Sequence, residues 1–265
     1  MRLSDRQKEI YSRQIMMQEV GEEGQQKLAS ASVLVIGCGG LGAPVLYYLT
    51  AMGIGKIGLC DGDIVSLPNL NRQILFTMDD IGRSKTEAAQ KRLTALNPEL
   101  KVTIYDRFID EDLAEKIIPG YDIVVDCLDN FATRFILNNA CVKAKKPLIH
   151  AGIGEFYGQL MTIIPGKSPC LRCLFPDGIK EKQKNRPPAS NEAQNLSPCF
   201  TPVIGTTPGV LGTLQAIEVM KYIIGMPVYT EGMLVVDTLN QTMDKVRLEV
   251  LPKCICRHDM CDTEN

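Results

Sequence analysis

SVLVIGCGGLG, residues 32–42, joins a short apolar run to a glycine-rich turn. The β-branched run is typical of a buried strand, and the glycines follow the G-x-G-x-x-G pattern. The apolar residues at 43–53 then have the spacing of a buried helix. Glycines in such a turn let backbone N–H groups approach a phosphate at the positive end of the helix. The stretch therefore predicts a strand, a turn and a helix that together bind a nucleotide.

The segments after this unit alternate between short apolar runs and helical patterns. We expect strands at 56–61, 101–106, 122–127 and 147–152, with helices between them, including one at 131–145. This order predicts an α/β fold, a Rossmann-like doubly wound sheet that is mostly parallel and carries helices on both faces.

The pattern loosens in the second half of the chain. A strand at 159–165 begins a different arrangement, and a helix follows at 207–225. Two late strands are expected at 233–239 and 245–251. We therefore expect an additional C-terminal antiparallel portion, together with the structural zinc site described below.

One domain over residues 1–265 is expected, with four parts in chain order. These are N-terminal helices at 1–30, a nucleotide-binding core at 31–153, a mobile crossover loop at 174–200, and a C-terminal helix, strands and zinc tail at 201–265. The loop is polar and rich in proline, and a long segment of that kind within a compact domain is usually functional, often as a lid.

The composition is that of an ordinary globular protein and excludes several classes. Of 265 residues, 45% are hydrophobic and 23% are charged, which argues against disorder over most of the chain. Lys and Arg number 29 against 31 Asp and Glu, so the net charge is −2. This balance gives no basic footprint for a nucleic-acid or membrane-surface partner.

The cysteines and the start of the chain predict a cytoplasmic protein. Ten cysteines occur, and the charged opening MRLSDRQKEIYSRQ does not resemble a secretory signal, so we expect a reducing compartment rather than a disulfide framework. Residues 31–55 carry no charge and have the length of a membrane span. Their glycines and Pro44 favour a strand, a turn and a helix instead.

Four polar residues near predicted strand ends are candidates for nucleotide contacts. Asp61 ends the second strand, where a carboxylate can hold ribose hydroxyls. Lys85 lies in the first turn of a helix, where a bound polyphosphate would offset the unfavourable helix dipole, although a solvated lysine is also compatible. Arg72 fits a phosphate contact or a surface ion pair. Asp129 fits a ligand at a strand end, the N-cap of helix 131–145, or both.

Two pairs of cysteines predict a zinc site. Cys170-x-x-Cys173 supplies half of a tetrahedral thiolate site, and Cys254 with Cys256 supplies the other half. Cys261 is an alternative ligand in the same cluster. A redox C-x-x-C is a further alternative, but we expect no helix N-terminus there to lower a thiol pKa.

The other cysteines divide into two groups. Cys38, Cys60, Cys127 and Cys141 fall in apolar runs and are expected in the core. Cys199 ends the long polar loop, where an exposed thiol is a candidate nucleophile or an idle surface residue.

The motifs of the whole chain, taken in order, resemble those of the E1-like adenylyltransferases of the MoeB/ThiF/HesA family. They are Tyr11-Ser12-Arg13-Gln14, Val33–Gly42, Leu59-x-Asp61-x-Asp63-x-Val65, Asn69-Leu70-x-Arg72-Gln73, Gly82-x-x-Lys85, Asn97-Pro98, Asp126–Asn130 and Cys170-x-x-Cys173. The resemblance implies an enzyme that uses ATP to adenylate the C-terminal Gly-Gly carboxylate of a small ubiquitin-fold sulfur-carrier protein, releasing pyrophosphate.

The resemblance also implies roles for individual residues. ATP would be bound by Gly40, Asp61, Asn69, Arg72, Lys85, Asp129 and Asn130, with Asp129 holding Mg²⁺. Arg13 resembles an arginine finger that reaches into the partner subunit, which implies a homodimer. Cys199 matches the crossover-loop cysteine that forms a covalent link to the carrier in some members. Its neighbours Phe200-Thr201-Pro202-Val203 depart from the small residues usual there, which weakens that role, and C-x-C replaces the usual C-x-x-C in the tail.

Two alternatives to adenylation are an NAD(P)-dependent oxidoreductase built on the same glycine loop and a non-catalytic E1-like scaffold. The first leaves Arg72, Lys85 and the zinc cysteines unexplained, and the second leaves the set of charged residues unexplained. The sequence contains no rhodanese or ubiquitin-fold domain, so the carrier and the sulfur donor are expected to be separate chains. The pathway that receives the sulfur is not encoded in these motifs.

Overall fold

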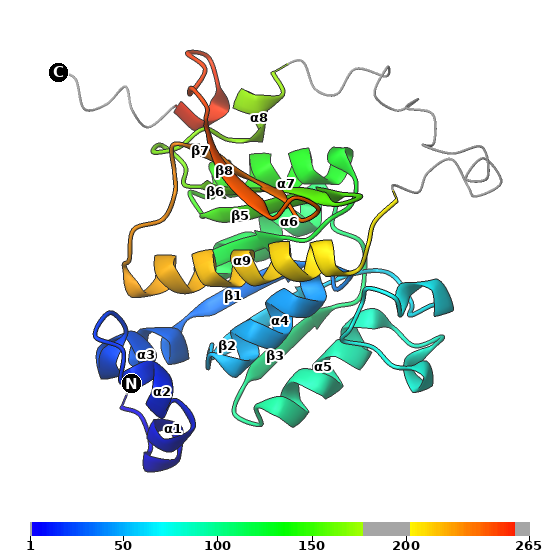
Figure 1. Cartoon of the computed structure of the whole chain (residues 1–265), viewed down its shortest axis with the longest axis vertical. Coiled ribbons are helices and arrows are strands. Elements are labelled where there is room, and N and C mark those ends of the chain that lie inside the picture. Colours follow the sequence, from blue (N-terminus) through cyan, green and yellow to red (C-terminus); the bar gives the residue numbers. More distant parts are fainter. Residues whose placement is uncertain (1, 177–201, 258–265) are drawn as a thin grey trace.

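The computed structural model describes residues 2–176 and 202–257 and is built around one eight-stranded sheet (Figure 1). The strand order is β3-β2-β1-β4-β5-β6-β7-β8. The strands are β1 (Ser32–Ile36), β2 (Lys56–Cys60), β3 (Lys101–Tyr105), β4 (Ile123–Asp126), β5 (Leu148–Gly154), β6 (Tyr157–Ile163), β7 (Gly232–Asp237) and β8 (Thr242–Arg247).

The first five strands are parallel and the last three are antiparallel. β3, β2, β1, β4 and β5 pair in parallel, and β6, β7 and β8 then add as an antiparallel extension. This arrangement confirms the predicted mostly parallel sheet with a C-terminal antiparallel portion. The chain runs outward from β1 to β3 and then crosses to β4, so the strand order reverses between β1 and β4. Ligands of doubly wound sheets bind at such a reversal, at the carboxyl ends of the strands.

Helices cover both faces of the sheet (Figure 1). The helices are α1 (Asp5–Ile10), α2 (Ser12–Ile15), α3 (Gly21–Ser30), α4 (Gly42–Ala51), α5 (Lys85–Leu96), α6 (Glu111–Ile117), α7 (Phe131–Lys143), α8 (Leu171–Leu174) and α9 (Thr206–Ile224). α4, α5 and α9 contribute to one apolar core, and α6, α7 and α8 contribute to the other. β1 lies between the two cores, with Val33 and Val35 in one and Leu34 and Ile36 in the other. A strand covered on both faces reads as a continuous apolar run, which is why the sequence identified it.

The last strand begins earlier than predicted. A strand was expected at 245–251, whereas β8 begins at Thr242 and ends at Arg247. It forms a hairpin with β7 in which the Asp237 carboxylate accepts hydrogen bonds from the backbone N–H groups of Leu239 and Asn240. Every residue of β8 is exposed, so hydrophobicity carries no information about its limits.

The uncharged stretch 31–55 forms β1, the glycine turn and α4, as predicted. In the described part of the chain, none of the helices combines the length and apolar character needed to cross a membrane.

The glycine turn tolerates no added side chain at its last position. A Cβ atom on Gly42 would overlap the carbonyl oxygen of Gly37, whereas one on Gly209, in α9, would meet no atom within 4 Å. We expect Gly42→Ala to lower the free energy of unfolding by about 3 kcal/mol or more, because the backbone of the turn must move. Gly209→Ala, the matched control, should raise it by up to about 1 kcal/mol through helix propensity. Urea unfolding measures both; equal effects would contradict the predicted close approach.

Candidate functional site

The glycine loop lies against the end of the neighbouring strand β4. Gly37 has φ +95°, and a Cβ atom there would lie 2.6 Å from the carbonyl oxygen of Cys127. Only glycine combines this backbone conformation with this close approach. The backbone N–H of Cys38 donates a 2.7 Å hydrogen bond to the Asp61 carboxylate, which fixes the loop to the end of β2. The loop is therefore held from both neighbouring strands, with its open side at the carboxyl edge of the sheet.

Asp61 and Lys85 lie close together beside this loop. Asp61 also accepts a hydrogen bond of 2.9 Å from the backbone of Asp63. Burial raises the pKa of the Asp61 carboxyl, while the Lys85 ammonium and the two backbone donors oppose that rise. The Lys85 side chain is only 6% exposed, and its Nζ lies 2.8 Å from Asp63 Oδ2. This burial excludes the solvated-lysine alternative. A cation so poorly hydrated at the glycine loop is suited to binding a phosphate.

The segment that follows β2 carries Asn69 and Arg72 toward the glycine loop. The Asn69 side chain accepts a hydrogen bond from the Ser66 backbone and closes a 3₁₀ turn, η1 (Leu67–Asn69). Arg72 Nη1 donates to the Pro68 carbonyl at 3.0 Å, and a Cβ atom on Gly40 would lie 3.5 Å from Arg72 Cγ. Local hydrogen bonds thus place the Arg72 side chain beside Gly40.

Asp129 and Asn130 occupy the turn after β4. Of the alternatives for Asp129, the N-cap role is excluded: Asn130 is the N-cap of α7, and its side chain accepts a 2.9 Å hydrogen bond from the Thr133 backbone. The asparagine oxygen takes the capping role, which leaves the exposed Asp129 carboxylate without that task. Because β1 and β4 are adjacent and parallel, this turn and the glycine loop lie at the same edge of the sheet.

A buried polar cluster behind this turn was not singled out from the sequence. His150 Nδ1 lies 2.6 Å from the Asp126 carboxylate, and both side chains are fully buried. Arg134, on α7, is also buried, and one of its nitrogens donates to the Leu128 carbonyl. Gln215, on α9, donates to the Asp126 carbonyl at 2.8 Å. A charged residue one turn into a largely apolar helix was the signal that could have revealed Arg134.

Arg13 lies far from the glycine loop of its own chain. It is exposed on α2, next to Gln14, whose side chain donates to the carbonyl of Met52 just beyond the C-terminus of α4. The glycine loop is at the other end of α4, whose ten residues span about 15 Å. The structure therefore does not bring Arg13 together with the other candidate residues within one chain.

Four cysteines meet in one cluster beside α7. The Sγ atoms of Cys170, Cys173, Cys254 and Cys256 all lie within 4.8 Å of one another. Two of the distances are 3.5 Å, from Cys170 to Cys254 and from Cys173 to Cys256. A tetrahedral zinc site with Zn–S bonds of about 2.3 Å has sulfur–sulfur edges of about 3.8 Å. The donor set and its spacing therefore fit Zn²⁺.

The residues around the cysteine cluster include a short helix that the sequence did not predict. Cys170 is the N-cap residue of the four-residue helix α8, so the expectation that no helix begins there is wrong. The Asn138 side chain, fully buried, accepts a hydrogen bond from the backbone of Leu171 and orients this segment. Such contacts around the ligands are typical of metal sites. Cys261 lies outside the described residues.

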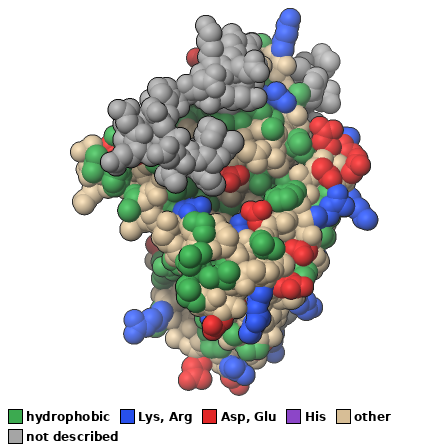
Figure 2. All heavy atoms as spheres, turned by 90° about the vertical axis from the view of Figure 1, so that its right-hand side faces the viewer, with side chains coloured by type: hydrophobic (Ala, Val, Ile, Leu, Met, Phe, Trp, Pro, Cys, Tyr) green, Lys and Arg blue, Asp and Glu red, His purple; other side chains and the backbone are tan. Residues whose placement is uncertain are grey.

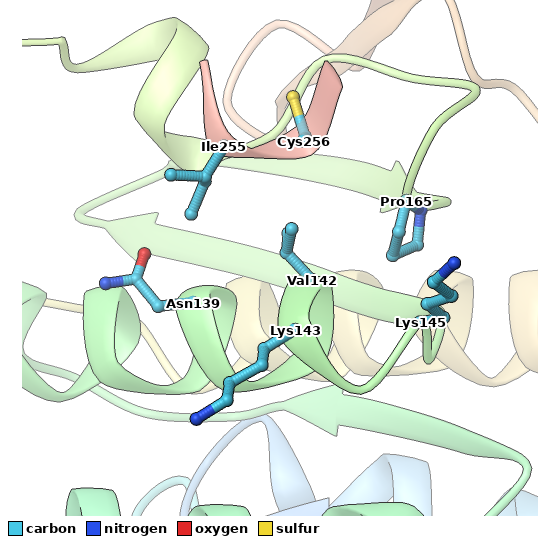
Figure 3. A pocket seen from close by; sticks show the side chains of 7 residues that line it. All are labelled: Asn139, Val142, Lys143, Lys145, Pro165, Ile255 and Cys256. Carbon is cyan, nitrogen blue, oxygen red and sulfur yellow. The ribbon is translucent and has the colours of Figure 1, made fainter. Parts of the chain in front are cut away.

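A cavity of about 410 Å³ lies between the end of α7 and the segment that carries Ile255 and Cys256 (Figure 3). Its lining includes Val142 and Lys143 of α7 on one side and Ile255, Cys256 and Pro165 on the other. It lies at the zinc tail and not at the glycine loop. The candidate nucleotide site is therefore defined by its charged side chains and its backbone, not by this cavity.

The remaining cysteine predictions have two outcomes. Cys38, Cys60, Cys127 and Cys141 are buried in the two apolar cores, as expected. Burial raises the pKa of each of these thiols, so they are poor nucleophiles. Cys199 and most of the loop 174–200 lie outside the described residues, so its nucleophilic role stays a prediction.

Comparison with known proteins agrees with this geometry. Residues 11–257 match the ThiF family. The chain belongs to this family. A sulfur carrier protein adenylyltransferase from Thermus thermophilus is 39% identical, over 96% of this chain and 92% of that protein. The ThiS adenylyltransferase from Escherichia coli is 42% identical, over 84% of each chain.

Other relatives of the ThiF-family chain are longer. The mouse adenylyltransferase and sulfurtransferase MOCS3 is 41% identical over 92% of this chain, which spans about half (51%) of its length. Among solved structures, Escherichia coli MccB with MccA-N7isoASN has a TM-score of 0.80 at 27% identity, covering 96% of this chain and 75% of that one. Relatives of similar length and longer relatives thus both contain a region similar to most of this chain.

The cysteine cluster predicts a measurable metal content. Protein purified under reducing conditions should hold about one zinc ion per chain, because four thiolates fill the coordination sphere. We expect Cys256→Ser to lose the zinc and to lower the thermal unfolding midpoint by about 5 °C or more, which corresponds to roughly 2 kcal/mol. Elemental analysis and calorimetry measure both. Cys141→Ala, outside the cluster, should keep its zinc; an unchanged zinc content in Cys256→Ser would contradict the ligand set.

Burial of His150 predicts a loss of stability in acid. Burial lowers the pKa of His150 from its ordinary value of 6.5, against the opposing effect of Asp126. Below that pH the unfolded chain binds a proton on this side chain that the folded protein does not bind, so stability falls as the pH falls. Between pH 7.5 and 5.5 we expect the wild type to lose about 1 kcal/mol more than His150→Asn. Urea unfolding at both pH values tests this; an identical pH dependence would contradict it.

Proposed function

We propose that this chain transfers AMP from ATP to the C-terminal Gly-Gly carboxylate of a small ubiquitin-fold sulfur-carrier protein. The observation that carries the proposal is the buried Lys85 ammonium, held beside Asp61 at the glycine loop. Support comes from relatives named as adenylyltransferases of sulfur carriers and from a solved structure of MccB with ATP, 28% identical to this chain.

The site residues divide by the part of ATP that each would hold. Backbone N–H groups around Gly40 and the N-terminus of α4 would face the phosphates, and the Asp61 carboxylate would hold the ribose hydroxyls. Asn69 would support that pocket from its 3₁₀ turn, and Asn130 would do so from the N-cap of α7. Lys85 and Arg72 would supply positive charge to the phosphates. The exposed Asp129 carboxylate would hold Mg²⁺, which supplies further charge neutralisation when bound.

The reaction needs alignment more than acid–base chemistry. The carrier carboxylate is already ionised near neutral pH, so no general base is required. One of its oxygens forms a bond to the α-phosphorus while the bond to the bridging oxygen breaks and pyrophosphate leaves. Negative charge builds on the phosphates as this happens. Lys85 and Arg72, fixed by the contacts described above, would stabilise that charge with little reorganisation.

The alternatives receive less support. A nicotinamide enzyme would leave Arg72, Lys85 and the cysteine cluster without a joint explanation, and none of the relatives reported above is named as an oxidoreductase. A scaffold without activity would not require Arg72, Lys85 and Asp129 to be kept at the same edge of the sheet. A reducing, cytoplasmic location agrees with the lack of disulfides among the eight described cysteines. The separate sulfur donor stays a prediction.

A homodimer would complete the site with Arg13. Exposed large apolar side chains gather on the N-terminal helices and on the segment after β2. They are Ile10, Met16 and Met17 in the first group, and Ile64, Leu67, Ile74, Met78 and Ile81 in the second. Figure 2, which views the side of the molecule that carries the second group, has hydrophobic side chains gathered beside charged ones. Twofold pairing of the two groups would bury both and bring Arg13 toward the partner's Gly40 and Lys85.

The last strand of the sheet would offer a docking surface for the carrier. In the described chain, β8 is the outermost strand; it has a free edge, and all of its residues are exposed, including Met243 and Val246. Unpaired edge strands with exposed apolar side chains favour pairing with another protein. We propose this surface as the docking site of the ubiquitin-fold carrier, because β7 and β6 link β8 within one sheet to β5, whose carboxyl end lies at the edge where ATP would bind.

ATP–pyrophosphate exchange tests the reaction and the arginine finger together. With Mg²⁺ and a panel of Gly-Gly-ending carriers, exchange should appear with one carrier and vanish when its last glycine is deleted. Arg13→Ala and Lys85→Ala should each lower exchange by about 10³-fold or more. An equal mixture of the two variants, after subunits are allowed to exchange, should recover about one quarter of wild-type activity, because half of the dimers then hold one intact site.

Each outcome separates one part of the proposal. ATP binding without exchange would point to a carrier outside the panel or to a scaffold. A protein that NAD stabilises against heat and ATP does not would overturn the adenylation proposal. Recovery of no activity in the mixture, with both variants dimeric, would overturn the contribution of Arg13 from the partner subunit.

A further inference from the structure

The cluster of Asp126, His150 and Arg134 has no place in the chemistry above. All three side chains are buried, at 5% exposure or less, directly behind the turn that carries Asp129 and Asn130. Burying an arginine requires partners, and here the partners are mostly backbone carbonyls. Arg134 donates to the Leu128 carbonyl and, at 3.2 Å, to the Ala151 carbonyl. It therefore joins the turn after β4 to the neighbouring strand β5.

The Asp126 carboxylate also holds the turn after β4. Asp126 Oδ1 accepts a 3.0 Å hydrogen bond from the Leu128 backbone, while Oδ2 faces His150 and lies 4.0 Å from Arg134 Nε. Leu128 thus has its N–H bound by Asp126 and its carbonyl bound by Arg134. Since Asp129 is the next residue, these two bonds hold the backbone from which its exposed carboxylate extends.

Opposite charges lie together in this buried cluster. The Arg134 guanidinium offsets the charge of the Asp126 carboxylate. The contact between His150 Nδ1 and the same carboxylate orients the imidazole, which does not need to carry a positive charge. The guanidinium also lies over the ring of Phe131, 5.3 Å from its centroid. A guanidinium presents a rigid fork of donors, which a lysine ammonium cannot reproduce. The contacts therefore require arginine in particular.

We propose that Arg134 is a positioning residue that sets the Asp129 carboxylate for the metal-bound nucleotide. This inference rests on the proposed function, because it concerns the same ATP site. Arg134 would act through the Leu128 carbonyl and touch neither ATP nor the carrier. Loss of contacts of this kind around a metal ligand lowers metal affinity or activity by about 10- to 100-fold.

Arg134→Lys is the test, because it keeps the charge opposite Asp126 and removes the fork. We expect the Mg²⁺ concentration for half-maximal pyrophosphate exchange to rise about tenfold or more, with a smaller change in the KM for the carrier. Phe131→Leu, which removes the ring beneath the guanidinium together with its edge contact to Phe175, should shift the Mg²⁺ dependence in the same direction and to a lesser extent. The matched control is Arg172→Lys, because Arg172 lies over Phe135, 4.4 Å from that ring, and faces Asn139 instead of the turn.

The readouts distinguish the possible failures. A wild-type protein that neither binds ATP nor exchanges pyrophosphate would overturn the proposed function itself. Wild-type exchange with an unchanged Mg²⁺ dependence in Arg134→Lys and Phe131→Leu would overturn the positioning role alone. An equal loss of exchange at every Mg²⁺ concentration, accompanied by a lower unfolding midpoint, would assign Arg134 a structural role and would also overturn the inference.

Discussion

The close approach of Gly37 to the Cys127 carbonyl is the contact on which the site depends. It brings the glycine loop of β1 against the end of β4, at the point where the strand order reverses. A side chain at Gly37 would separate the two strand ends, and with them the residues proposed for the ribose and for the metal. The hydrogen bond from Cys38 to Asp61 then ties in β2. Three strand ends are thus fixed by backbone contacts before any ligand binds.

The cysteine cluster is a second constraint, and it acts near the antiparallel part of the sheet. The cysteine cluster joins α8 to the 3₁₀ turn η6 (Ile255–Arg257), two segments more than eighty residues apart. α8 follows directly from the antiparallel strands, and η6 ends the described chain. Cross-linking of this kind stabilises a region whose last strand, β8, is wholly exposed and buries little apolar surface. The metal would therefore support the part of the sheet that hydrophobic packing supports least.

Much of this architecture was predictable, for identifiable physical reasons. Strands covered on both faces appear as apolar runs, so β1, β2, β4 and β5 were located within a few residues. β8 was misplaced because an exposed hairpin is defined by its turn at Asp237, not by hydrophobicity. The N-cap remained one of the alternatives for Asp129 because position alone does not decide between neighbouring caps; Asn130 fills that role. Arg134 and His150 escaped notice because their role depends on contacts between α7 and β5, which no local pattern encodes.

The ion pair between Lys85 and Asp63 means that Lys85 does not offer an unpaired cation to ATP. Its ammonium is already matched to a carboxylate that remains half exposed at the rim. An arriving phosphate must therefore exchange one anion for another, so part of its attraction is spent on separating the pair. The same arrangement eases departure, because the rim carboxylate recaptures the ammonium as pyrophosphate leaves. Such a site favours turnover over tight retention of its nucleotide.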